Sequence, residues 1–333
     1  MDRRHFLLLT SALVGSVALK PAIAKAYIRI VVISDLNSQY GATDYEPEVD
    51  KALAMIPQWQ PDLVLCGGDM VAGQKTSLTP SQIQAMWSAF DQHISQPLKK
   101  AKIPFAFTVG NHDASGAQSQ GQYIFSQERE LARAYWKNPR HTPNLNFIDR
   151  GNFPFYYSFF HKGIFYLVWD ASTHLLGNQQ LAWVEKSLGS AIARKAKMKI
   201  VIGHLPLYGI AKGREKPGDF LANGEQLRGL LERYRVHTYI SGHAHAYYPA
   251  KRGQLELLHA GALGSGPRQL LNSTLTPGKT LTILDIDIDA ATAMYTSYDM
   301  KTLKVIDIKT LPPFIVAHNG QVFRRDIAPK TIN

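Results

Sequence analysis

Residues 28–37 read IRIVVISDLN, an apolar and largely β-branched run that ends at Ser34-Asp35. β-Branched residues favour strands. A helical pattern of apolar residues follows around residues 49–56. The stretch therefore predicts a strand, a carboxylate at the strand end and a returning helix, which is the unit from which α/β folds are built.

The same alternation recurs through the first half of the chain. Segments with the pattern of a strand or a helix follow one another at residues 63–66, 83–94, 105–109, 200–202 and 221–234. Between them, residues 155–160 and 164–169 predict a strand pair that turns at Lys162-Gly163.

After His245 the pattern changes to alternating apolar and polar residues. The segments that show it are residues 255–259, 280–288, 293–298 and 305–308, and they predict antiparallel strands. A first half of strands and helices with a β-rich second half predicts two sheets face to face with helices outside, or else a separate C-terminal β domain.

Five short polar motifs follow the apolar runs, at the places where α/β folds build their sites. They are Asp35-Leu36-Asn37, Gly67-Gly68-Asp69, Gly110-Asn111-His112-Asp113, Gly203-His204 and Gly242-His243-Ala244-His245. A lone Gly-Asp is ordinarily a turn. Together, however, the motifs supply the mixture of oxygen and imidazole ligands that divalent transition metals prefer.

The spacing within the motifs adds two expectations. His243 and His245 are one residue apart, so in an extended segment both rings would face the same way. The glycines before Asp69, Asn111, His204 and His243 suit sharp exits from strands and a close approach of the backbone to an anion.

The motifs and their order resemble the calcineurin-like metallophosphoesterases, whose pattern is Asp-x-His, Gly-Asp, Gly-Asn-His-Asp/Glu, a later Gly-His and Gly-His-x-His. The resemblance covers residues 28 to about 260, and residues 180–185, QLAWVE, are similar to the helix that precedes the Gly-His strand in the family. It implies an α/β fold, a four-layer αββα sandwich of two mixed β-sheets flanked by helices.

The resemblance also implies two divalent metal ions, with manganese, iron, zinc or magnesium as candidates. The implied metal ligands are Asp35 and His245 for the first ion, Asn111, His204 and His243 for the second, and Asp69 for both. His112 would face the substrate and protonate the leaving oxygen. The implied activity is hydrolysis of a phosphomonoester or phosphodiester by attack of a metal-bound hydroxide.

Asn37 departs from the family pattern, because most members have histidine at this position. An amide oxygen is a weaker and harder ligand than imidazole, so the first metal would be looser or selected towards manganese or magnesium. Alternatively, Asn37 only caps the turn after the strand. The departure also motivates a second interpretation, a non-catalytic protein that binds a phosphoester through a single metal.

The segment after Asp69 departs from two subfamilies. Residues 70–73, MVAG, lack the tyrosine of purple acid phosphatases and the Asp-Arg of protein serine/threonine phosphatases. His112 thereby lacks the carboxylate partner that those phosphatases supply, and Asp113 is expected to have a structural part instead of a catalytic one.

Other polar and aromatic residues have a simpler expectation. We expect His161, His174 and His259 to be packed or solvated. Arg252 and Arg268 could meet a phosphate, but we expect a solvated face for either. Three tyrosines beside the motifs would either line the substrate pocket or belong to the core: Tyr208, Tyr247 and Tyr248.

The N-terminus predicts export. Residues 1–26 contain Arg3-Arg4, a short apolar stretch and the small residues Ala22, Ala24 and Ala26, the pattern of a cleavable signal peptide of the twin-arginine type. Residues 27–333 would then form one metallophosphoesterase domain in the periplasm or another extracytoplasmic compartment, with residues 270–333 as its β-rich C-terminal extension. Contact with a membrane is expected only during export.

Composition limits the partners. The formal net charge of +11 favours anionic substrates, and we expect a small phosphorylated one. The basic residues are scattered and no nucleic-acid-binding motif accompanies them. The single cysteine, Cys66, excludes an intrachain disulfide and is expected to be buried in a strand. The sequence leaves the oligomeric state open.

Overall fold

The computed structural model describes residues 27–264 and 266–327. The predicted signal peptide, residues 1–26, lies outside the described residues. Within the described ranges, no helix is long and apolar enough to cross a bilayer.

The first of the two large sheets contains the strand predicted from residues 28–33. Its strand order is β15 (Lys304–Val305), β14 (Thr292–Asp299), β13 (Thr280–Asp287), β1 (Ile28–Ile33), β2 (Leu63–Cys66) and β3 (Phe105–Phe107). β1, β2 and β3 run parallel, and β13 pairs antiparallel with β1. The carboxyl ends of the three parallel strands therefore meet at one edge of the sheet.

The second sheet is also mixed. Its strand order is β16 (Phe314–Ala317), β17 (Gly320–Arg324), β11 (Tyr247–Arg252), β12 (Leu255–Ala260), β10 (Thr238–Ser241), β9 (Met198–Ile202), β8 (Ile164–Val168), β7 (Tyr157–His161) and β6 (Phe147–Asp149). β8, β9, β10 and β12 run parallel. Two short strands, β4 (Gln118–Ser119) and β5 (Gln122–Tyr123), form a separate hairpin.

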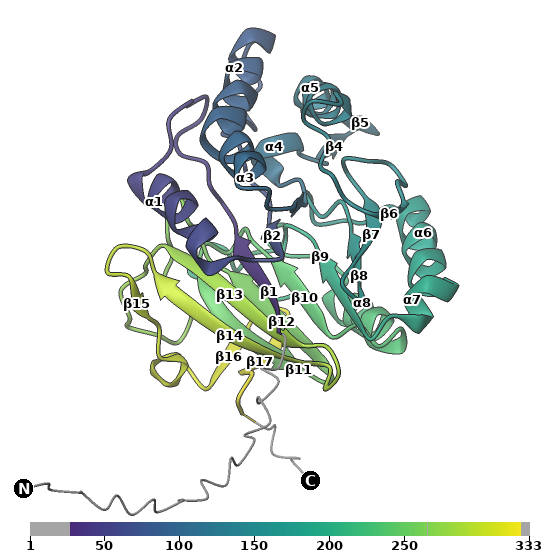
Figure 1. Ribbon diagram of the computed structural model, residues 1–333, viewed down its shortest axis with the longest axis vertical. Coiled ribbons are helices and arrows are strands. Elements are labelled where there is room, and N and C mark those ends of the chain that lie inside the picture. Colours follow the sequence, from purple (N-terminus) through teal and green to yellow (C-terminus); the bar gives the residue numbers. More distant parts are fainter. Residues whose placement is uncertain (1–26, 265, 328–333) are drawn as a thin grey trace, which may run out of the picture.

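Helices flank both sheets. Figure 1 shows α1 (Pro47–Met55), α2 (Pro80–Phe90) and α3 (Gln96–Lys100) on the side of β1 and β2, and α6 (Asn178–Leu188), α7 (Ala191–Lys195) and α8 (Gly224–Arg233) on the side of β7, β8 and β9. The other helical elements are a 3₁₀ turn (Ile56–Trp59), a π turn (Asp91–Ser95), α4 (Asn111–Ala114), α5 (Ser126–Lys137) and a 3₁₀ turn (Ile308–Thr310).

The two sheets share one hydrophobic core. A single cluster of buried side chains contains Val31 and Leu284 from the first sheet and Ile202 and Leu258 from the second. The fold is thus the four-layer sandwich of helices, sheet, sheet and helices that the sequence predicted. The late strands complete it, because β13 joins the first sheet and β17 joins the second, and they form no β domain of their own.

Several local predictions are confirmed and others are wrong. The turn between β7 and β8 has positive φ at both Lys162 and Gly163, as a tight hairpin requires. By contrast, β12 is not purely antiparallel, because it runs parallel to β10. Of the segment 305–308 only Val305 lies in a strand, since a 3₁₀ turn begins at Ile308. The sequence patterns did not predict α5, β11, β16 or β17.

His259 is a packed residue, as the sequence predicted. It lies in β12, is 1% exposed, and neither ring nitrogen has a hydrogen-bond partner among the described residues. Burial lowers the pKa of His259 to about 3. An unfolded chain would take up a proton here below a pH of about 6.5, whereas the folded protein resists it, so folding stability falls as the pH drops from about 6.5 towards 3.

We therefore predict that His259→Leu makes the protein less sensitive to acid. Between pH 7 and pH 4.5 the unfolding free energy of the wild type should lose about 2–3 kcal/mol more than that of the variant. Urea unfolding at the two pH values measures this difference. The pKa values of His161 and His237 are also lowered by burial, but their effect is common to both proteins. An equal loss in wild type and variant would contradict the prediction.

Candidate metal centre

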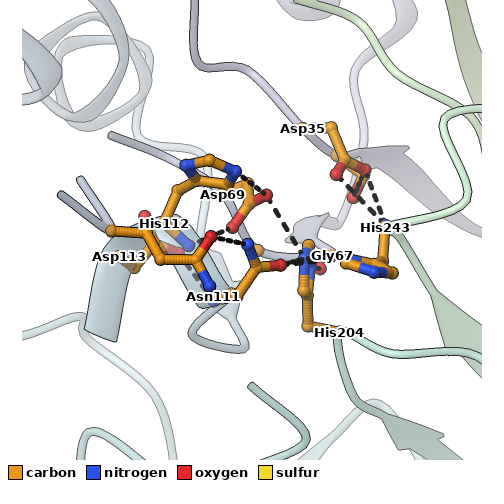
Figure 2. A network of polar contacts seen from close by, with 12 residues as sticks. Asp35, Gly67, Asp69, Asn111, His112, Asp113, His204 and His243 are labelled. Carbon is orange, nitrogen blue, oxygen red and sulfur yellow. Dashed lines mark hydrogen bonds and ion pairs between the residues drawn. The ribbon is translucent and has the colours of Figure 1, made fainter. Parts of the chain in front are cut away.

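The five polar motifs meet at the carboxyl ends of the parallel strands of both sheets. Asp35 follows β1, Asp69 follows β2, and Asn111 and His112 open α4 just after β3. His204 follows β9, while His243 and His245 lie between β10 and β11. Figure 2 shows the labelled side chains of these motifs pointing towards one another. The structure therefore brings together residues that are far apart in the sequence, such as Asp35 and His243, which are 208 positions apart.

Four of these residues have a left-handed backbone. The φ angles are +51° at Asp35, +54° at Asp69, +63° at His243 and +51° at His245. Each such residue costs roughly 1–3 kcal/mol and is kept only where the surrounding structure enforces it. The prediction that His243 and His245 lie in an extended segment is wrong, because both residues turn sharply.

The glycines of the motifs are required mainly for space. Gly68 has a φ of +97°, as a sharp strand exit demands. Gly110 and Gly242, however, do not have a positive φ. A Cβ at Gly110 would lie 2.1 Å from Asp69 Oδ1, and a Cβ at Gly242 would lie 2.1 Å from Ser34 Oγ. For these two positions the expected role in a sharp turn is wrong, and the close packing of the site is the reason for glycine.

Two imidazole rings meet at the side-chain oxygen of Asn111. Its Oδ1 lies 3.0 Å from His204 Nε2 and 2.8 Å from His243 Nδ1. His204 Nδ1 donates to Gly67 O at 2.8 Å, which leaves Nε2 facing the centre. His204 Nε2 also lies 3.3 Å from Asp69 Oδ2. These are the residues that the family resemblance implies for the second metal.

A second group of ligand atoms meets around Asp35. Its Oδ1 lies 3.2 Å from His245 Nε2, and Oδ2 accepts a hydrogen bond from Ser34 Oγ at 2.6 Å. The backbone N–H of His243 donates to the same carboxylate at 3.1 Å, which ties the two groups together. Ligand atoms of Asp35, Asp69 and His204 all lie within 4.8 Å of one another. This is the arrangement expected for a carboxylate-rich metal site.

The residues fit a metal because some of their polar atoms are otherwise left without partners. Asp69 Oδ2 and His245 Nε2 are buried atoms, and within the described part of the chain neither makes a well-directed hydrogen bond. A buried polar atom without a partner costs about 1–3 kcal/mol. Divalent cations held by these side chains would satisfy both atoms.

The charges also favour a cation. Burial alone would raise the pKa of Asp69, but His204 and His112 hold this pKa well below its ordinary value, so the carboxylate is ionised. Burial alone would lower the pKa of His204, yet the charge of Asp69 raises it to about 9. The interior position beside Asp69 thus attracts positive charge, whether as a proton or as a metal ion.

His112 has a backbone carbonyl in place of a carboxylate partner. Its Nδ1 lies 3.0 Å from Gly73 O, its backbone N–H donates to Asp69 Oδ1 at 2.8 Å, and its Nε2 lies 3.9 Å from Asp69 Oδ2. Nδ1 therefore donates to the carbonyl, and Nε2 is left for the substrate side.

Glu128 of α5 fixes the loop that carries this carbonyl. Its carboxylate accepts hydrogen bonds from the backbone N–H groups of Gln74 at 2.7 Å and Lys75 at 3.1 Å. Gln74 Oε1 in turn accepts from Asn111 Nδ2 at 2.7 Å. Sequence reasoning missed Glu128, because it belongs to no motif and lies 54 residues from Gln74.

Asp113 has a structural part. Its carboxylate accepts from the backbone N–H groups of Gly110 at 2.8 Å, Met70 at 2.7 Å and Val71 at 2.9 Å. Burial and the charge of Asp69 raise its pKa to about 7. The side chain joins the loop after β2 to the start of α4, and it does not line the pocket beside His112 and His245.

Asn37 lies at the edge of the centre. Its backbone N–H donates to Asp69 O at 3.1 Å, and the residue is buried. It also lines an open pocket of about 500 Å³ together with Ser38, Gln39, Tyr40, Lys75, His112, His245, Gly266 and Arg268. The backbone bond suits a turn-capping role and the pocket position suits ligation, so both interpretations remain.

The other candidates are placed as follows. Tyr208, Tyr247 and Tyr248 are buried in the core, which answers the alternative left open for them. Arg252 Nε pairs with Glu225 Oε1 at 2.5 Å, away from the centre. Arg268 is partly exposed and lines the open pocket beside His245, a position that is solvated and also allows contact with a phosphate.

Comparisons with known structures find proteins of a similar fold. A purple acid phosphatase from seeds of yellow lupin (Lupinus luteus) has a similar fold, with a TM-score of 0.62 and 18% identity over 85% of this chain and 53% of the lupin chain. This chain thus spans about half of the lupin protein. The structure described as GAP50, the anchor in the inner membrane complex of Plasmodium, has a TM-score of 0.56 and 14% identity over 85% of this chain and 88% of that one. At such identities the likeness shows the fold.

A comparison with curated protein sequences found no match. The sequence profile described as calcineurin-like phosphoesterase matches residues 28–247, which include all five motifs and well over half of the chain. The chain therefore belongs to the calcineurin-like phosphoesterase family.

Proposed function

We propose that the protein is an exported enzyme that hydrolyses a small phosphomonoester or phosphodiester with two bound divalent metal ions. The observation that carries the proposal is a pair of buried atoms that make no well-directed hydrogen bond in the described ranges: Asp69 Oδ2, beside the ring of His204, and His245 Nε2, beside the carboxylate of Asp35. Manganese, iron, zinc and magnesium all accept such ligands.

The contacts around Asp35 and around Asn111 indicate which residues would hold each ion. Asp35 and His245 would hold the first, Asn111, His204 and His243 the second, and Asp69 both, with Asn37 as a further candidate for the first. When bound, the ions polarise the phosphoryl group and activate water as the nucleophile.

His112 is positioned to act as the general acid. Its Nδ1–H donates to Gly73 O in either protonation state, so the ring keeps one orientation and presents Nε2 to the pocket. The carboxylate of Asp69 lies 3.9 Å from Nε2. From this position Nε2 would deliver its proton to the leaving oxygen of the ester.

The proposed export rests on residues 1–26, with Arg3-Arg4, the apolar stretch and the alanine cleavage sites. The periplasm or another extracytoplasmic compartment follows from that signal. The net charge of +11 supports an anionic small molecule as the substrate.

Asn37 keeps a second candidate function open, a non-catalytic protein that binds a phosphoester through one metal. An amide at this position would weaken the first metal site and leave the second intact. Metal analysis of the purified protein separates the two functions. One ion per chain, with ligand binding and no turnover, would favour the binding protein.

His112→Ala provides the first test of the enzyme. With manganese added, the wild type should hydrolyse p-nitrophenyl phosphate or its diester, and the variant should lose about 10²–10⁴-fold in kcat because the proton donor is gone. Metal content, measured by plasma mass spectrometry, should stay at two ions in both proteins. Two bound ions without any turnover in the wild type would count heavily against the proposal.

Asn37→His tests the weak position of the site. An imidazole is a stronger ligand than an amide, so the variant should bind the more weakly held of its two manganese ions more tightly. Titration of the metal-free protein with manganese, followed by calorimetry, measures both affinities. Unchanged affinities would show that Asn37 serves the turn and not the metal.

Glu128→Ala tests the support of the general acid. Without this carboxylate the loop of Gly73 and Gln74 loses its anchor, and kcat should fall by about 10- to 100-fold because His112 is misplaced, while metal content is kept. Glu128→Gln should recover part of the loss, since its carbonyl still accepts one of the two hydrogen bonds. Glu130, exposed on the same helix, provides the matched control Glu130→Ala. Equal kcat values in all four proteins would rule out this role.

A further inference from the structure

Two loops beside the metal centre are hydrogen-bonded to each other. The first loop is residues 203–223, between β9 and α8, and the second loop is residues 266–279, before β13. Lys212 N donates to Gln269 O at 2.9 Å, Leu271 N donates to Ile210 O at 2.8 Å, and Ala211 and Leu270 form an isolated β-bridge. The second loop is also fixed to the centre, because Arg268 N donates to His245 O at 2.8 Å. Side chains carried by these loops therefore have a defined position relative to the metal ligands.

Arg268 projects from the second loop into the pocket. It lines the pocket together with His112 and His245. Its guanidinium lies against the first loop, since a Cβ built on Gly213 would be 2.7 Å from Arg268 Nη1. The guanidinium is poorly satisfied. Nη1 makes only a long contact of 3.5 Å to Lys212 O, and Nε is buried without a hydrogen-bond partner in the described part of the chain.

Arg214 lies on the first loop, on the side of His243. Its Nη1 is 3.6 Å from Asp219 Oδ1, and that oxygen is 4.0 Å from His243 Nε2. Arg214 Nε is likewise buried and, among residues 27–264 and 266–327, has no hydrogen-bond partner. The two arginines thus lie beside the two histidines of one motif, Arg214 near His243 and Arg268 near His245.

The two guanidinium groups are close enough to repel each other. Burial and the charge of Arg214 both lower the pKa of Arg268. The nearby carboxylates compensate incompletely, because Asp219 is beyond hydrogen-bond distance of Arg214 and Glu215 Oε2 is itself buried without a partner in the described ranges. Two half-buried like charges, each with an Nε that has no hydrogen-bond partner among the described residues, suit an anion with more than one oxygen.

We propose that Arg214 and Arg268 form a subsite for a second phosphate group of the substrate. The proposal rests on the proposed function and names its substrate class: a phosphate ester whose leaving group carries a further phosphate. The leaving group would occupy the pocket of about 500 Å³ that His112 and Arg268 share, so both ends of a small bisphosphate would be held at once. Lys75, which lines the same pocket, adds a third positive charge.

The kinetic test compares alkyl monophosphates with the matching alkanediol bisphosphates of the same chain length, across several lengths. At the best length the metal-loaded wild type should prefer the bisphosphate by about 10- to 100-fold in kcat/KM, the effect of a charge-assisted hydrogen-bonded pair. Arg268→Gln and Arg214→Gln should bring this ratio close to one. Arg252→Gln is the matched control, because Arg252 is paired with Glu225 away from the pocket, and it should keep the wild-type ratio.

Three results would overturn the subsite. They are a wild type without preference, variants that keep the wild-type ratio, and variants that lose both substrates equally. The last result would mean that the arginines contact the reacting phosphate itself.

A binding measurement keeps the subsite separate from the proposed function. Calorimetry with an alkylphosphonate and the matching bisphosphonate, which are not hydrolysed, should show the same 10- to 100-fold preference in the wild type and its loss in Arg268→Gln. If this pattern appears while no ester is hydrolysed, the proposed function fails and the subsite stands. If hydrolysis occurs but neither protein prefers the bisphosphonate, the subsite fails and the proposed function stands.

Discussion

The buried negative charge of Asp69 is the constraint on which the site depends. A carboxylate that is 1% exposed has little access to water, so positive groups must surround it. His204 Nε2 at 3.3 Å and His112 Nε2 at 3.9 Å are two such groups, and the metal ions proposed here would be the others. Asp35, on the opposite side of the centre, is also buried and likewise needs positive groups beside it. The site is therefore arranged around cations from both sides.

Holding this charge in place needs a rigid surrounding. Left-handed backbone at Asp35, Asp69, His243 and His245 turns the ligand atoms inwards, and strain of this kind persists only where neighbouring contacts enforce it. Asp113 supplies three of these contacts by bonding the N–H groups of two adjacent loops. Glu128 does the same for the loop of Gly73, on which the orientation of His112 depends. The carboxylates of Asp113 and Glu128 thus position the residues that face the substrate.

The sequence predicted the parts of the structure that depend on local pattern. A β-branched run predicted β1, a short apolar run predicted β2, and the order of the five motifs identified the residues that meet at the strand ends. Features that depend on distant contacts were missed. Glu128 acts on a loop 54 residues away, and nothing near Arg268 in the sequence shows the loop of Arg214 against it. The parallel pairing of β12 with β10 was missed for the same reason, since neighbours in a sheet need not be neighbours in the sequence.

The central claim is that one buried carboxylate, Asp69, serves two metal ions at once. The most direct measurement is a crystal structure of the manganese-loaded protein with anomalous scattering data. The claim predicts two anomalous peaks, one beside Asp35 and His245 and one beside Asn111, His204 and His243, both within bonding distance of Asp69. A single peak at saturating manganese, or two peaks of which only one contacts Asp69, would contradict it.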